Sequence, residues 1–241
     1  LPAELAALVE KTAALDVRGS ANNVNYRAYD RLFRQLAEIG TLESLAAAVW
    51  LSKQLLIKVP QGEWPIEHMA LINNVIQTQV RLGHFEGVSD GLDQYEEDVA
   101  LVMSRVKGKP APNQLLAYDM AATFYRNLVV NLYHHESHDI FFQLTGRGLR
   151  YIASMGQGDR YAKQTAIILY MQGLRYLVME QNELALERLT AAEDKDPLDY
   201  RMGVSKAKAL LRVGQAEAAE QHLQATVARN PKQAAEAYQI Y

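Results

Sequence analysis

Cysteine is absent from this 241-residue sequence, which excludes disulfide bonds and thiolate metal sites. No apolar run approaches the ~18 residues of a membrane span. Neither sign of charge dominates, since 25 Lys and Arg face 28 Asp and Glu, so there is no broad basic field for nucleic acid. The first nine residues lack the basic start of a secretory signal. We therefore expect a soluble cytoplasmic protein that does not contact nucleic acid directly, with the periplasm left open.

The hydrophobic residues recur with a helical period throughout the chain. Their content of 49% is enough to bury a core, and no alternating pattern of useful strand length occurs. The sequence therefore predicts an all-α protein. The expected helices cover residues 1–15, 24–39, 42–57, 66–82, 85–106, 114–133 and 139–155, followed by those of the segment 159–231.

A repeat organises the C-terminal part of the chain. Its two copies begin at Ala166 and Tyr200, and the prolines that end them, Pro197 and Pro231, are 34 residues apart. The residues shared at equivalent positions are Leu169, Gly173, Tyr176, Ala185, Leu189 and Ala192 in the first copy and Gly203, Ala207, Leu210, Ala219, Leu223 and Thr226 in the second. This period and these residue types resemble the tetratricopeptide repeat, a unit of two helices.

Small residues in the repeat mark close helix contacts. Only a small side chain at Gly173 and Ala207 lets two helix backbones approach to about 8 to 9 Å. Gly203 departs from the pattern, because it replaces a large residue. We expect a packing gap there, which either leaves the final unit looser or is filled by the next helix. Asn182 and Gly214 are expected to form the turns inside the two copies.

The resemblance implies one right-handed α-solenoid of about five antiparallel helix pairs over residues 1–241. Segment 1–110 holds units with longer helices, with turns at Gly40 and Gly83, and 113–158 holds a degenerate unit. Segment 159–231 holds the two regular repeats, opened by a helix that Asp159 caps, and 232–241 forms a capping helix over the end of the stack. The segment 107–112 reads as a linker.

The resemblance also implies a concave groove lined by the first helix of each pair. Carrying the family's lining positions over gives a polar set early in the chain and a more apolar set late. The candidate partner-binding residues are Arg27, Asp30, Arg34, Asn73, Gln77, Asp119, Thr123, Arg126, Tyr170, Leu174, Arg201 and Lys208, and further lining positions include Leu177, Val204 and Leu211. The lysine, asparagine and arginine set of the family's carboxylate clamp is not found.

One cluster has the residue types of a reactive site. His134, His135, Glu136, His138 and Asp139 include pairs spaced four apart, as metal ligands on a helix can be. The cluster falls where one helix should end and the next begin, so we interpret it as a solvated turn rather than a metal site. Gly146-Arg147-Gly148 follows no predicted strand, which argues against a phosphate loop. We expect no catalytic residues, no metal and no cofactor.

These observations favour a non-catalytic module that binds a protein or peptide partner of unknown identity in its groove, as part of a larger bacterial protein or assembly. The alternative is a sensor domain of a signalling or transcription regulator, whose front half encloses a small molecule or peptide. An enclosed apolar cavity would favour the sensor, and an open groove would favour the binding module.

Overall fold

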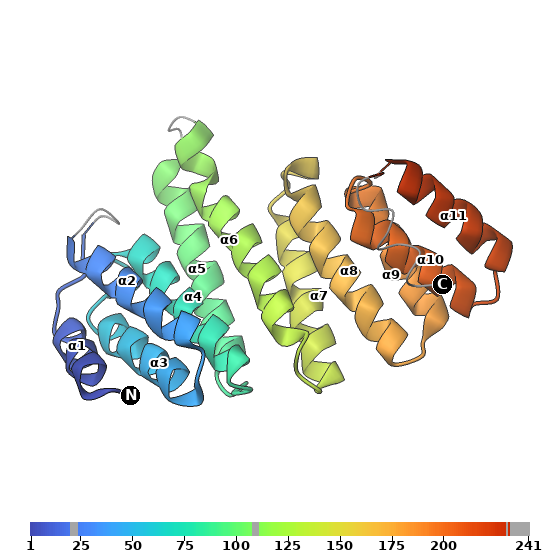
Figure 1. Cartoon of the computed structure of the whole chain (residues 1–241). Coiled ribbons are helices and arrows are strands. Elements are labelled where there is room, and N and C mark those ends of the chain that lie inside the picture. The colour runs from blue at the N-terminus through green and yellow to red at the C-terminus, as the bar shows by residue number, and fades with distance from the viewer. Residues whose placement is uncertain (20–23, 108–110, 230, 232–241) are drawn as a thin grey trace. The chain divides into compact units, whose positions relative to one another are not determined.

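A computed structural model describes residues 1–19, 24–107, 111–229 and 231 of the chain. Within these ranges the secondary structure is helical and no strand occurs, which confirms the all-α prediction (Figure 1). No helix in the same ranges is long and apolar enough to cross a membrane. The capping helix expected over 232–241 lies outside the described residues.

The chain divides into two compact units, Leu1–Phe124 and Tyr125–Tyr241. The boundary falls within one helix and not in the 107–112 segment. The helices of unit 1 are α1 (Ala3–Ala13), α2 (Val24–Ile39), α3 (Leu42–Leu56), α4 (Pro65–Arg81), α5 (Val88–Val106) and the first part of α6 (Ala111–Leu132). Unit 2 holds the rest of α6, α7 (His138–Ser154), the 3-10 helix η1 (Gly158–Tyr161), α8 (Ala162–Val178), α9 (Asn182–Lys195), α10 (Tyr200–Arg212) and α11 (Ala216–Arg229).

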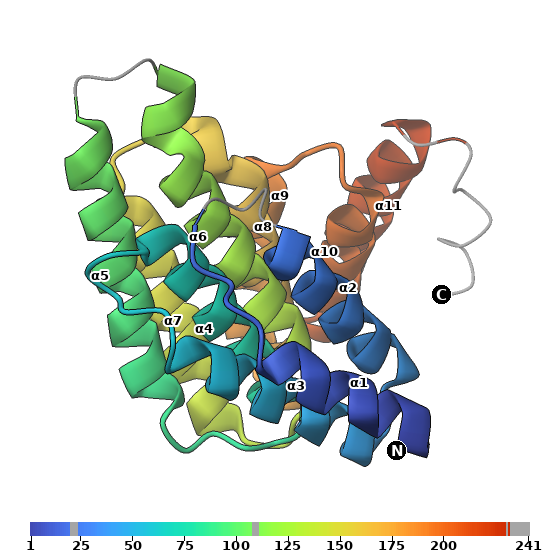
Figure 2. The same ribbon diagram turned by 90° about the vertical axis from the view of Figure 1, so that its left-hand side faces the viewer.

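In unit 1, α2, α3 and α4 pack in sequence order, and α1 lies against both α2 and α3 (Figure 2). The buried Tyr29 joins three of these helices. Its hydroxyl lies 2.8 Å from the hydroxyl of Ser52 on α3 and accepts a hydrogen bond of 2.8 Å from Asn74 on α4. Burial raises the pKa of Tyr29, so this hydroxyl stays neutral and serves as a fixed hydrogen-bonding post.

In unit 2, α8 packs on α9, α9 on α10 and α10 on α11, while α8 also contacts α10. Gly173 on α8 is a tight contact, because an added Cβ would lie 2.6 Å from Cγ of Leu189 on α9. Of the two alternatives at Gly203, the structure shows the second, because the next helix fills the space. An added Cβ there would lie 2.6 Å from Oγ1 of Thr226, so α11 closes on the glycine and leaves no space for a side chain.

The turns of the regular repeats are the same in backbone form but not in residue type. Gly214 adopts φ +81° after α10, and its counterpart 34 residues earlier is Glu180, at φ 58° after α8. The prediction that Asn182 forms this turn is therefore wrong, because Asn182 is already the first residue of α9. Asp159 also fails as a helix cap: it lies inside η1, and its carboxylate accepts a hydrogen bond from Lys195.

Candidate functional site

The two regular repeats hold α8 and α10 in equivalent positions. After α8 the N–H of Gln181 bonds to the carbonyl of Tyr176 at 3.0 Å, and after α10 the N–H of Gln215 bonds to Leu210 at 3.0 Å. Both are the six-residue closures of a Schellman turn. Residues of α8 and α10 that are one repeat apart therefore lie at matching places relative to their turns.

An open pocket of about 250 Å³ lies on these helices in unit 2. Three parts of the unit contribute to it: Tyr133, directly after α6, one face of α8, and one face of α10. Its lining residues are Tyr133, Leu174, Leu177, Val178, Val204, Ser205, Lys208 and Arg212.

The wall from α8 is apolar. Leu177 of α8 and Val204 of α10 are nearly fully buried, whereas Val178 of α8 is 65% exposed. Val178 therefore leaves apolar surface exposed within the pocket lining. The pocket is therefore suited to bind one apolar side chain.

The rim from α10 is cationic. Lys208 and Arg212 are four residues apart, and the lining contains no carboxylate. Arg212 donates to the carbonyl of Leu177 at 2.9 Å, which fixes the guanidinium at the rim. Lys208 makes no hydrogen bond or ion pair within the described ranges. Two like charges at this spacing repel one another, by about 0.2 to 0.5 kcal/mol on a helix surface.

Tyr133 is held in place by the buried Arg175. The guanidinium lies 5.2 Å from the centre of the Tyr133 ring and 4.7 Å from that of Phe141. It also donates to the carbonyls of Leu132 and Tyr133. Arg175 is 5% exposed, and this loss of water lowers its pKa. The arginine thus fixes the aromatic side of the pocket without entering the lining.

Several predicted groove residues lie at or beside this pocket. Leu174 and Lys208 line it, as do the further positions Leu177 and Val204. The hydroxyl of Tyr170 lies 3.4 Å from that of the lining residue Ser205, and burial raises the pKa of Tyr170.

Two other predicted residues of unit 2 have local partners. Arg201 pairs with Asp199, which caps α10, at 2.5 Å. Arg126, on the unit 2 part of α6, donates to the side chain of its neighbour Asn127.

The predicted residues of unit 1 lie on α2, α4 and α6. Arg34 and Asp30 form an ion pair of 2.9 Å along α2, and Arg27 is exposed on the same helix. On α4, Asn73 donates to the side chain of Asn74 at 2.9 Å, and Gln77 donates to the carbonyl of Phe124 at 3.0 Å. Asp119 and Thr123 are half-buried on α6.

The histidine cluster lies in the turn between α6 and α7, as its position in the sequence indicated. His134 and His135 follow α6, and His138 is the first residue of α7, with its Nδ1 3.4 Å from Arg175. Among the described residues no group of three His, Cys, Asp or Glu side chains could hold a metal ion. Gly148 of the glycine motif is a helix contact, since an added Cβ would lie 2.8 Å from the ring of Tyr125.

The sequence did not identify Tyr133, Val178, Ser205 and Arg212 as site residues. A signal for Arg212 was present, because an arginine two residues before the turn glycine recurs at Arg81 and Gly83. Arg81 makes the equivalent contact in unit 1, donating to the carbonyl of Ala37 at 3.1 Å. An arginine two residues before such a turn glycine therefore indicates a hydrogen bond to the C-terminal end of the helix two before it in the chain.

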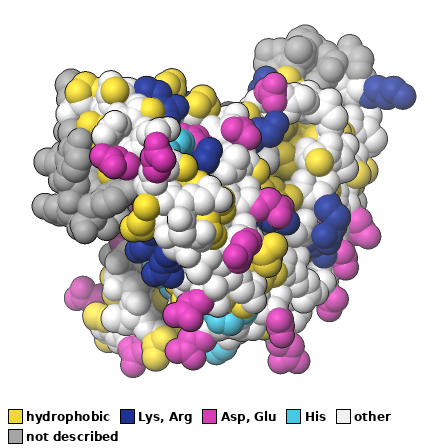
Figure 3. Space-filling view, turned by 90° about the vertical axis from the view of Figure 1, so that its right-hand side faces the viewer, with side chains coloured by type: hydrophobic (Ala, Val, Ile, Leu, Met, Phe, Trp, Pro, Cys, Tyr) yellow, Lys and Arg dark blue, Asp and Glu magenta, His cyan; other side chains and the backbone are white. Residues whose placement is uncertain are grey.

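The surface carries no dominant charge on the face seen in Figure 3, where acidic and basic side chains are interspersed. In the pocket lining, Lys208 and Arg212 are accompanied by no carboxylate. No family model, curated protein or solved structure matches the chain.

Proposed function

We propose that the chain is a right-handed solenoid of about five antiparallel helix pairs, similar to tetratricopeptide repeats, and that it binds a partner protein or peptide without catalysis. The repeat architecture is supported by the equivalence of the turns at Glu180 and Gly214 and by the tight contact at Gly173. Short turns of this kind connect helices that return alongside one another, as in antiparallel pairs.

The observation that carries the binding function is the pocket on α8 and α10. Its lining includes Leu174 and Lys208, two of the first-helix positions at which the repeat resemblance predicts a groove. Its combination of apolar wall and cationic rim suits recognition of a side chain and its neighbour. A peptide chain can place both.

The open form of the pocket favours the binding module over the sensor. Val178 is largely exposed, and both cations lie at the surface. A small molecule would keep much of its own surface in water here, while ligand sites that sense small molecules bury most of the ligand. A longer segment of a partner could continue beyond the pocket and gain further contacts.

The test is site-specific photo-crosslinking in cells of the native host. A benzophenone amino acid replaces Val178 in one variant and Leu184 in the other. Leu184 is an exposed leucine on α9, 41% exposed, and serves as the matched control. We expect a discrete crosslinked protein from position 178, identified by mass spectrometry and bound again after purification, and none from position 184. Crosslinks from position 184 alone would refute the groove.

A further inference from the structure

The chemistry of the pocket specifies more than a general peptide site. Its base and wall are apolar, through Leu174, Leu177 and Val204, and its rim holds Lys208 and Arg212 with no carboxylate in the lining. A partner that placed a cation or a wholly apolar segment there would leave both charges uncompensated. A carboxylate would relieve their mutual repulsion, and arginine can hold it in a two-point contact.

The spacing along α10 restricts how the partner presents these groups. Val204 and Lys208 are four residues apart, which is slightly more than one turn, or about 6 Å along the helix axis. In an extended peptide, side chains two residues apart point to the same side and are separated by about 6.6 Å. An apolar side chain over Val204 therefore brings the side chain two residues away to the level of Lys208, and Arg212 lies one helical turn further along α10.

We infer that the pocket recognises an extended segment of a partner protein in which an aliphatic or aromatic residue and an aspartate or glutamate are two positions apart. This inference rests on the proposed function and names the chemistry of the segment that the groove binds. The apolar side chain of the partner binds among Leu174, Leu177 and Val204, beside Tyr133 and Val178. The acidic side chain meets the α10 rim, where the N–H groups of Arg212 that Leu177 leaves unused can donate to it.

The first step of the test is peptide selection. A phage-displayed library of random peptides, in which no random position is a free chain end, is panned on the full chain and on Val178→Glu. We expect peptides enriched on the full chain to share an apolar residue and an acidic residue two positions apart. Enrichment of apolar peptides without the acid would overturn the inference while supporting the groove. An absence of peptides that distinguish the two proteins would refute both proposals.

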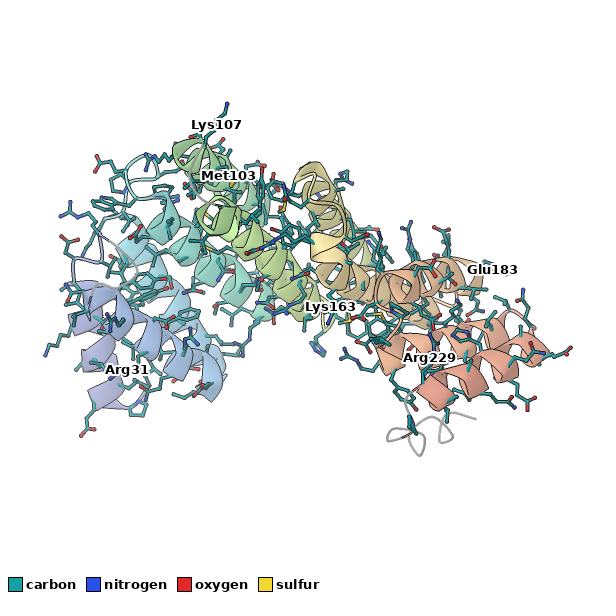
Figure 4. The ribbon with its side chains drawn as sticks, turned by 90° about the horizontal axis from the view of Figure 1, so that it is seen from above. Arg31, Met103, Lys107, Lys163, Glu183 and Arg229 are labelled. Atoms are coloured by element: carbon teal, nitrogen blue, oxygen red, sulfur yellow. The ribbon has the colours of Figure 1, made fainter. Side chains whose placement is uncertain are left out.

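The second step measures charge recognition with the enriched peptide, synthesised with both ends blocked and labelled with fluorescein. Its affinity is measured by anisotropy for Lys208→Gln and for the double variant with Arg212→Gln. The control is Arg150→Gln with Lys163→Gln, which removes the same charge from two exposed cations of unit 2, the second labelled in Figure 4. We expect binding to weaken about tenfold or more in the rim variants only.

Two further comparisons keep the result interpretable. Arg212→Gln removes both the charge and the hydrogen bond to Leu177, whereas Arg212→Lys retains the charge. We therefore expect Arg212→Lys to preserve most of the affinity for the peptide. If the double variant unfolds, Lys208→Gln alone decides, because Lys208 has no partner among the described residues whose loss could unfold the chain. Equal affinity of the acidic peptide and its glutamine analogue would show that the rim does not read charge.

Discussion

Glu193 offers the sharpest test of how unit 2 is held together. This carboxylate on α9 is buried, with 8% of the side chain exposed, and three basic side chains lie against it. Lys206 on α10 lies at 3.0 Å, and His222 and Arg229 on α11 lie at 3.2 and 2.9 Å. Arg229, labelled in Figure 4, belongs to the last turn of α11. The cluster therefore joins three helices through one acidic group.

The structure gives the size of the effect. Burial alone would raise the pKa of Glu193, but the close approach of His222 and the hydrogen bonds from Lys206 and Arg229 outweigh it and lower the pKa from 4.5 to about 2. A difference of that size corresponds to about 3 kcal/mol of folding free energy. Because the folded-state pKa is the lower one, this stability is present above pH 4.5 and is lost as the pH falls through about 2.

We therefore expect Glu193→Gln to destabilise unit 2 by about 3 kcal/mol above pH 4.5 and by little near pH 2. The measurement is urea unfolding at a series of pH values. Trp50 and Trp64, the two tryptophans of the sequence, both lie in unit 1, so their fluorescence reports on that unit. Far-ultraviolet circular dichroism reports on both units. We expect the loss of unit 2 stability to appear in the circular dichroism signal.

The matched control is Glu187→Gln on the same helix. Glu187 is 62% exposed and lies 3.6 Å from Arg188, so its loss should cost at most about 1 kcal/mol. A cost for Glu193→Gln that stays constant from neutral pH to pH 2 would refute the reasoning. The side chain would then act through packing and not through its charge.

Three other substitutions test separate features of the fold. Gly173→Ala should cost about 1 to 3 kcal/mol in urea unfolding, because its Cβ would lie 2.6 Å from Cγ of Leu189, and the same substitution should cost less when Leu189→Ala is already present. His68→Ala should lower the free energy of unfolding, followed by tryptophan fluorescence, by about 3 to 5 kcal/mol, since it leaves the fully buried Asp98, now 2.6 Å from His68, without its ion-pair partner. Glu180→Gly should raise thermal stability by up to about 1 kcal/mol, because glycine adopts φ 58° without strain; a loss would show that the glutamate side chain stabilises the turn.

The helix boundaries could be predicted where local chemistry fixes them. Gly40 takes φ +68°, and Thr41 caps α3 by accepting a hydrogen bond from the N–H of Ser44. Both are signals of residue type at one position, so the end of α2 at Ile39 and the start of α3 at Leu42 follow from the sequence. The start of α5 was placed three residues early, at Phe85 instead of Val88, because Gly87 takes the left-handed conformation and delays the helix.

Features that depend on contacts between distant residues could not be predicted in this way. The absent side chain at Gly203 suggested a gap, but the position is closed by Thr226, 23 residues later. Nothing near Gly203 in the sequence indicates how closely α11 approaches. The turn at Glu180 was missed for a related reason, because the residue type argues against a left-handed backbone, and only the 34-residue spacing from Gly214 points to it.

The candidate site was predicted only in the regular repeats. Leu174 and Lys208 line the pocket because a fixed period carries a helix face from one copy to the next. Tyr133 lies after α6, in the degenerate unit, where no reliable period exists to place it. The wall that it forms depends instead on the buried Arg175, a contact across 42 residues that no local pattern encodes.

The arginines near the helix ends connect the stability of the fold to the character of the pocket. The last carbonyls of a helix have no partner within it, and a nearby cation interacts favourably with that end of the helix. Arg175 supplies this bond to the end of α6 from a buried position and so fixes the aromatic ring of Tyr133. Arg212 supplies the same bond to the end of α8 from the surface and remains available to a ligand. One recurring contact, made once in the interior and once at the rim, thus gives the pocket both its aromatic side and its cationic side.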